Sequence, residues 1–292
     1  MSHTCKLGSV DRRDFLLLLG AGLVSALGGC SSATNGHQVV ATTSPPTTTV
    51  KPAVTVPPVS TIVSTTTTTT LPSLPPIPAP RPGAPQVVMS AHGPTKQIAL
   101  TIDDGYCEEC VAGYVAFAAR TGIAITFSPN GSFRGIWDRH ADRLRPLIAA
   151  GQVQIANHTW SHKDLLTISH ATIGSEIERN EDWIQKTFGI TARPWFRPPY
   201  GKHNAGTDQV AASLGYTGIL MWNGTLGDAT LETPQELMSL AHKWVKEGSI
   251  LLGHANHPTV LSLFDQLQQL MDERGLQPVT IDTMFGTTRA TG

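Results

Sequence analysis

Short apolar runs alternate with longer amphipathic stretches from Gln97 onward. The runs predict strands at Gln97–Asp103, Ile123–Ser128, Gln152–Asn157, Trp195–Arg197, Thr217–Trp222, Ser249–His254 and Val279–Ile281. The stretches between them predict helices at Cys110–Arg120, Arg139–Ala150, Thr172–Phe188, Ala205–Leu214, Pro234–Val245 and Leu261–Arg274. Glycines stand just past these helices, where a left-handed residue commonly ends one: Gly122, Gly151, Gly189, Gly215, Gly248 and Gly275.

This repeated order of strand, helix and glycine is typical of βα units around a parallel sheet. The carboxylate, imidazole and guanidinium side chains that could take part in chemistry stand at the carboxyl ends of the expected strands. This favours a (β/α) barrel, since active sites of barrels form at that rim. We therefore expect an α/β barrel.

The first thirty residues resemble an export signal. Paired arginines, Arg12 and Arg13, precede the apolar stretch 15–29, which is shorter than the roughly 20 residues of a membrane span. Paired arginines in this position resemble a twin-arginine signal. The stretch ends in Leu-Gly-Gly-Cys, similar to a bacterial lipoprotein cleavage box that would place lipid on Cys30. We expect a lipoprotein exported to the outer face of the cytoplasmic membrane; an uncleaved anchor helix is the alternative.

Residues 31–85 have a different composition, rich in threonine and proline and almost free of charge. Such a segment buries too little apolar surface to offset its ordering entropy, so we expect an extended, disordered stalk. Residues 86–292 are enough for one domain with a sizeable core, and the chemical residues discussed below make this the expected catalytic domain.

Charge gives little sign of a charged partner. The chain has 21 Lys and Arg against 22 Asp and Glu, for a net charge of −1, and the basic residues are scattered. No basic stripe indicates nucleic-acid binding. The balance agrees with an uncharged or mixed-charge partner, and we expect a monomer.

The four cysteines divide between the expected export signal, the lipidation site and the folded domain. Cys5 would leave with the signal and Cys30 would carry lipid, which leaves Cys107 and Cys110. In an oxidising envelope a local disulfide between these two is favoured. A thioredoxin-like redox pair is the alternative. A zinc site at these two cysteines would need two further ligands.

Two adjacent carboxylates, Asp103 and Asp104, close the first long apolar run. Burying two like charges at a strand end is costly unless a cation compensates. His158 and His162 stand four residues apart, the spacing of one helical turn, and could supply imidazole ligands. Two histidines and one carboxylate form a familiar zinc set that leaves a position open for water. This pattern indicates a metal-dependent hydrolase.

Four sequence blocks occur in order: Thr-Ile-Asp-Asp-Gly, His-Thr-Trp-Ser-His, Phe-Arg-Pro-Pro-Tyr-Gly and Ile-Leu-Leu-Gly-His. Together they resemble the polysaccharide deacetylases, the NodB-like carbohydrate esterases, over about residues 95–283. The resemblance implies a distorted (β/α)7-type barrel, a divalent metal such as zinc, and removal of acetyl groups from polysaccharide sugars.

The resemblance also implies a role for each matching residue. Asp104, His158 and His162 would bind the metal, Asp103 would be the catalytic base, His254 the general acid, and Arg197 the partner of the base. The oxyanion and substrate site would include the Tyr200 backbone N–H, Leu252 at the acetyl-methyl pocket, and Trp222.

One block departs from the family pattern, which reads roughly Asp-x-x-Asp-Trp. Here Thr225 stands at the first aspartate and Ala229 at the tryptophan, while Asp228 aligns with the second aspartate, a residue that supports the catalytic histidine. Peptidoglycan is the substrate favoured by the expected location. Another metal-dependent amidase or esterase on the same barrel, or a glycan-binding pseudoenzyme, remain the alternatives.

Overall fold

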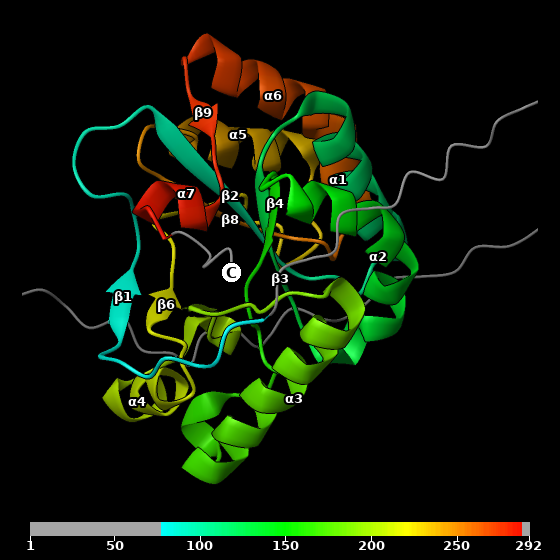
Figure 1. The fold of residues 1–292 in the computed structure, drawn as a ribbon. Helices are drawn as coiled ribbons and strands as arrows, with labels where there is room; N and C mark the ends of the chain where they lie inside the picture. Colours follow the sequence, from blue (N-terminus) through cyan, green and yellow to red (C-terminus); the bar gives the residue numbers. More distant parts are fainter. Residues whose placement is uncertain (1–76, 288–292) are drawn as a thin grey trace, which may run out of the picture. The chain divides into compact units, whose positions relative to one another are not determined.

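The computed structural model describes residues 77–287, in which short strands alternate with helices (Figure 1). The strands are β1 (Gln86–Val88), β2 (Gln97–Asp104), β3 (Ile125–Pro129), β4 (Val153–Ile155), β5 (Trp195–Phe196), β6 (Gly218–Leu220), β7 (Gly224–Thr225), β8 (Ile250–His254) and β9 (Gln277–Pro278). The helices are α1 (Glu108–Thr121), α2 (Arg134–Ala149), α3 (His170–Phe188), α4 (Ala205–Ser213), α5 (Pro234–Trp244), α6 (Phe264–Glu273) and α7 (Ile281–Phe285).

Two parallel sheets make up the barrel wall. One has the order β4-β3-β2-β8-β7 and the other β1-β6-β5, while β9 pairs with the start of β2. A parallel bridge between Asn157, just after β4, and Phe196 in β5 connects the two sheets. The order β6-β5-β4-β3-β2-β8-β7 therefore runs through parallel strands, as expected for a distorted (β/α)7-type barrel.

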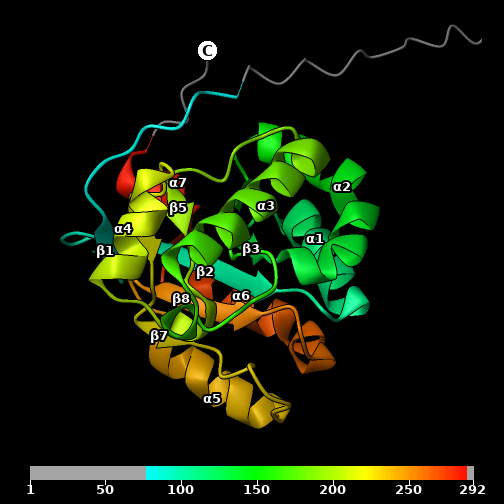
Figure 2. The same ribbon diagram turned by 90° about the horizontal axis from the view of Figure 1, so that it is seen from below.

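The helices lie around the central strands β2, β3 and β8 (Figures 1 and 2). Gly122 and Gly189 end α1 and α3 in the left-handed conformation, as the sequence predicts. The main core contains the large, fully buried side chains of Phe127, Trp137 and Phe188. This core fixes the barrel strands whose ends carry the polar residues.

Two predicted boundaries were wrong. The strand expected at Val279–Ile281 is absent: β9 ends at Pro278 and α7 begins at Ile281, because the Thr280 side chain accepts a hydrogen bond from the Thr283 N–H and caps a helix there. Helix α2 begins at Arg134, earlier than expected, since a 3-10 turn at Gly131–Phe133 leads directly into it.

The early start of α2 matters for the site, because it places Trp137 beneath the end of β2. The Trp137 indole N–H donates to the backbone carbonyl of Asp104 over 2.8 Å. Gly105 has φ 103° and lies against this indole; a Cβ there would come within 2.4 Å of Trp137 Nε1. The residue after the carboxylate pair must therefore be glycine.

The predicted signal, the lipidation site at Cys30 and stalk residues 31–76 lie outside the described residues. Residues 77–85 contain no helix or strand, and β1 begins at Gln86. Among residues 77–287, none of the helices combines the length and the apolar character that crossing a bilayer would require.

Candidate active site and metal centre

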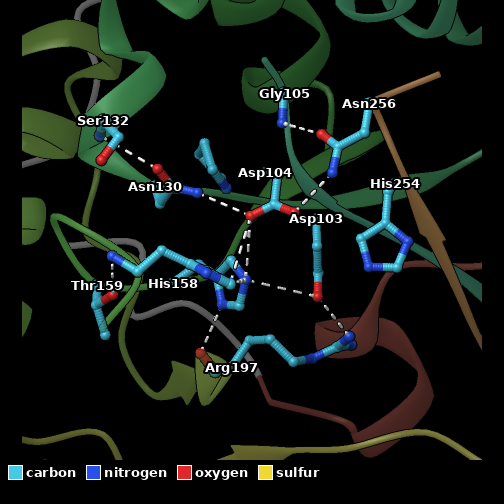
Figure 3. Close-up of polar contacts among 12 residues, drawn as sticks. Asp103, Asp104, Gly105, Asn130, Ser132, His158, Thr159, Arg197, His254 and Asn256 are labelled. Atoms are coloured by element: carbon cyan, nitrogen blue, oxygen red, sulfur yellow. Dashed lines mark hydrogen bonds and ion pairs between the residues drawn. The ribbon is translucent and has the colours of Figure 1, made fainter. Parts of the chain in front are cut away.

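The predicted chemical residues converge where the parallel strands end. Asp103 and Asp104 end β2, and His254 ends the neighbouring β8, where it lies beside Asp103 in the parallel register. His158 follows β4 and Arg197 follows β5. Figure 3 shows the side chains of all five residues directed toward one region.

Asp104, His158 and His162 form a group that could hold a metal ion. Asp104 Oδ1 lies 3.6 Å from His158 Nε2 and 3.5 Å from His162 Nε2, and the two Nε2 atoms are 3.1 Å apart. Ligands at zinc bond lengths of about 2.0–2.1 Å in a tetrahedron lie roughly 3.4 Å from one another. The three donor atoms therefore fit one small cation such as zinc.

The backbone directs these ligands through left-handed residues. Asp104 has φ 66°, Thr159 has φ 64° and His162 has φ 55°. Adjacent residues of a regular strand point to opposite faces, so the unusual conformation of Asp104 itself brings its carboxylate to the site beside Asp103. The helical interpretation of the histidine pair was wrong: His158 and His162 belong to a loop, with Thr159 between them.

Two asparagines hold the Asp104 carboxylate. Asn130 Nδ2 donates to Oδ1 and Asn256 Nδ2 donates to Oδ2, each over 2.8 Å. His158 Nδ1 lies 2.7 Å from the Arg197 backbone oxygen, which leaves its Nε2 for the metal. Sequence reasoning missed both asparagines. Each stands one or two residues past a strand end, so the strand-end criterion that selected Asp103 and His254 could have selected them.

The charges of the metal group suit a cation. Burial acts to raise the pKa of Asp104, but nearby His158 and His162 and the Asn256 hydrogen bond outweigh it and lower this pKa. Burial, together with the neighbouring His158, lowers the pKa of His162 to about 4. At neutral pH the group thus offers an ionised carboxylate and a neutral His162 imidazole, the protonation states that metal binding needs.

Asp103 has a different partner, the fully buried Arg197. Arg197 Nη1 donates to Asp103 Oδ2 over 3.1 Å, and Nη2 donates to Thr101 Oγ1 over 2.8 Å. Burial lowers the pKa of Arg197, an effect that the Asp103 charge opposes. Asp103 Oδ1 is buried without a hydrogen-bond partner among the described residues. This oxygen is free to accept a proton. Thr101 is another residue that the motif analysis missed.

His254 is held by Asp228, the one aspartate of the altered block. Asp228 Oδ1 lies 2.9 Å from His254 Nδ1, and Oδ2 accepts the His254 backbone N–H over 2.9 Å. Burial acts to lower the pKa of His254, but the hydrogen bond and charge of Asp228, with Asp103 and Asp104 nearby, raise it. The imidazolium form is therefore stabilised beside Asp103.

The remaining predicted residues surround this cluster. Tyr200 has φ 58°, is 62% exposed, and lies with its ring 4.5 Å from that of His162. Trp222 is half-buried, with its ring 5.3 Å from Arg197 Cζ. Leu252 is buried on β8 two residues before His254, so both side chains face the same side.

Cys107 and Cys110 form a disulfide at the start of α1, directly after the carboxylate turn. The Cys107 side chain also caps α1, accepting a hydrogen bond from the Cys110 N–H. The pair therefore fixes the chain where it leaves β2.

Comparison with known proteins points to one family. Residues 90–219 match the family model described as polysaccharide deacetylase. A protein of Arthroderma benhamiae named "Probable peptidoglycan-N-acetylglucosamine deacetylase" is 31% identical over 202 residues, covering 66% of this chain and 45% of that protein. The curated relatives compared are mostly longer, and the chain spans from 39% to 74% of their length.

Solved structures agree on the fold. The chitin deacetylase of Colletotrichum lindemuthianum superposes with a TM-score of 0.60 at 24% identity, over 70% of this chain and 93% of that one. A carbohydrate esterase family 4 pseudoenzyme from Bacillus anthracis gives 0.61 at 19% identity, over 69% of each chain. The barrel is thus of the NodB type. Family model and relatives together support a domain of the polysaccharide deacetylase family in this chain.

Proposed function

We propose that this chain is a metal-dependent deacetylase that removes acetyl groups from N-acetylated sugars of a cell-envelope polysaccharide. One observation carries the proposal: a metal-sized group of one carboxylate and two imidazoles lies beside a second carboxylate and a carboxylate-bound histidine. His158 Nε2 is 3.8 Å from Asp103 Oδ2, so the metal group and the proton-accepting group adjoin. Metal-assisted hydrolysis of an amide uses both, an ion that activates water and a base that accepts its proton.

Asp104, His158 and His162 would hold the metal, for which we propose zinc. When bound, such an ion activates water and polarises a carbonyl oxygen. The carboxylate and imidazole donors are those that zinc accepts in catalytic sites with three protein ligands.

The other residues handle protons. Asp103, paired with Arg197 Nη1, would accept the proton of the attacking water. His254, whose pKa Asp228 raises, would donate a proton to the departing sugar amine, which is otherwise a poor leaving group. The Tyr200 backbone N–H would donate a hydrogen bond to the oxyanion. Leu252 would contact the acetyl methyl group, and Trp222 would border the substrate site.

Location favours peptidoglycan as the natural polymer. A lipid on Cys30 and a stalk over residues 31–85 would hold the catalytic domain outside the membrane but near the wall. The name of the Arthroderma relative agrees with this substrate. Chitin-like oligomers and acetylated xylan are the competing polymers.

Two observations favour a second candidate, a glycan-binding pseudoenzyme. One solved structure of the same fold belongs to a pseudoenzyme, and the block around Thr225 and Ala229 departs from the family pattern. The intact group of Asp103, Arg197 and His254, with Asp228 in contact with His254, weighs against it.

Acetate release tests the proposal. The purified chain is incubated with N-acetylglucosamine oligomers and with peptidoglycan, before and after chelation, and after zinc is returned. We expect release that chelation abolishes and zinc restores. Bound metal without acetate from either polymer would direct the search to another amide or ester, whereas absence of both metal and acetate would favour the glycan-binding protein. The Asp104→Asn variant is the matched control for metal-independent background.

A further inference from the structure

Tyr106 is an aromatic residue on the surface beside the metal group, and no step of the proposed chemistry uses it. It is 44% exposed and stands two residues after Asp104. The Tyr106 backbone N–H donates to Asn256 Oδ1 over 3.5 Å, and the same asparagine donates from Nδ2 to the Asp104 carboxylate, which places Tyr106 next to the metal group.

The ring is fixed in place from several sides. Its hydroxyl is 2.9 Å from His257 Nε2, with the two rings edge to face at 5.7 Å. The Phe133 ring is also in contact, with its centroid 5.6 Å from that of Tyr106. Exposed tyrosines otherwise change rotamer freely, so these contacts remove much of the ordering cost that a ligand would have to meet.

The backbone beneath the ring is equally constrained. Asn256 Oδ1 accepts the Gly105 N–H over 3.2 Å while its Nδ2 holds Asp104, so one side chain ties the Tyr106 turn to the metal group. The next residue, Cys107, donates its N–H to the Ala255 carbonyl and forms the disulfide that begins α1. Figure 3 shows Gly105 and Asn256 on the side of Asp104 away from Arg197.

We propose that Tyr106, held by His257 and Phe133, is a stacking subsite for a pyranose ring next to the sugar that is deacetylated. The chemistry fits a neutral carbohydrate: an aromatic face for the sugar C–H surface, with the Tyr106 hydroxyl and the His257 imidazole at its edge to meet sugar hydroxyls. This assignment rests on the proposed function for the class of ligand, an N-acetylhexosamine polymer, and makes Tyr106 a residue that selects for chains over single sugars.

Binding to the metal-stripped full chain tests the subsite apart from catalysis. The probe is an N-acetylglucosamine tetramer, titrated by calorimetry into wild type, Tyr106→Ala, Tyr106→Phe and, as a control at another exposed apolar side chain, Met89→Ala. We expect Tyr106→Ala to raise Kd about tenfold, which is ~1.4 kcal/mol. The Kd of Tyr106→Phe, which keeps the ring, should stay within about threefold of the wild-type Kd. The Kd of Met89→Ala should equal that of wild type.

Unchanged binding by Tyr106→Ala, equal losses in Tyr106→Ala and Tyr106→Phe, or no binding of the tetramer by wild type would each overturn the subsite. Zinc binding by Tyr106→Ala, measured in the same preparation, shows that the neighbouring turn is intact. Tyr106-dependent binding without acetate release would keep the subsite and refute the deacetylase, so the two proposals fail separately.

Discussion

Asp103 and Asp104 are neighbours in sequence, yet the two sides of the site hold them by opposite means. Asp103 contacts a fixed cation, the buried guanidinium of Arg197, and its Oδ1 has no hydrogen-bond partner within residues 77–287. Asp104 is held by two neutral amides and faces two imidazoles, with no lysine or arginine ion pair among the described residues. The roles proposed above follow this difference: Asp103, paired with Arg197, would transfer protons, and Asp104, which faces the two imidazoles, would bind the metal.

The largest effects are expected when each aspartate is replaced separately, because one variant should lose zinc affinity and the other should lose kcat. Asp104→Asn should lower zinc affinity by more than about 100-fold, because loss of a supporting residue alone costs about 10–100-fold at metal sites. Asp103→Asn should bind zinc like wild type but lose roughly 10²–10⁴-fold in kcat, the usual contribution of a general base. Calorimetric zinc titration and acetate release measure the two effects.

The Asp103 variant also leaves Arg197 buried without its charge partner, which typically costs about 3–5 kcal/mol of folding free energy. Zinc binding must therefore be measured well below the melting temperature of each variant. Equal loss of zinc in both folded variants would contradict the division between the two carboxylates.

The Asp228→Asn variant tests whether Asp228 sets the pKa of His254, the proposed proton donor. Asp228 raises the pKa of His254, so the protonated acid persists to higher pH and activity falls as pH rises through this pKa. Without the carboxylate charge the pKa falls, and the alkaline limb of kcat should move to lower pH, with kcat reduced about 10–100-fold at its optimum.

His203 and Asp208 supply the matched control for that experiment, because their side chains form the same kind of pair at 2.9 Å outside the cluster. Asp208→Asn should leave the alkaline limb where it is in wild type. An unshifted limb in Asp228→Asn would mean that another group sets it.

The smallest effect is expected at Thr101, whose hydroxyl accepts from Arg197 Nη2. Thr101→Val keeps the shape but leaves a buried donor unpaired, which costs about 1–3 kcal/mol of stability. We expect kcat to fall roughly three- to tenfold through the displaced guanidinium. Thr126, in register with Thr101 on the adjacent β3, is the control: Thr126→Val should lose stability, shown by a lower melting temperature, but keep kcat. Equal kcat in both variants would remove Thr101 from the site.

Much of the barrel could be predicted from sequence because its signals are local. Apolar runs end in polar residues, and glycine ends helices α1 and α3, so most strands and helices were found within a few residues. The prediction failed at Val279–Ile281, where Thr280 caps a helix although the residues favour a strand. A cap that depends on the following turn is weaker in sequence than a long apolar run.

In the site, the sequence indicated the charged and imidazole residues but not the neutral residues that hold them. Charged and imidazole residues at strand ends attract notice, since burying them needs a reason, and the structure places Asp103, Asp104, His158 and His254 together. Asn130, Asn256 and Thr101 are ordinary in composition. Their importance comes from contacts over 26, 152 and 96 residues of separation, which no local pattern encodes.

The sequence by itself determined which chemical groups the chain offers, and that they stand where parallel strands end, because strand periodicity and residue type are local properties. Only the tertiary structure decided which oxygen meets which partner. The register that sets Asp103 beside His254, and the left-handed backbone that turns Asp104 toward two histidines, arise from packing between distant segments. Those long-range contacts give two adjacent, chemically identical carboxylates different surroundings. The proposed roles therefore differ: Asp103 as proton acceptor and Asp104 as metal ligand.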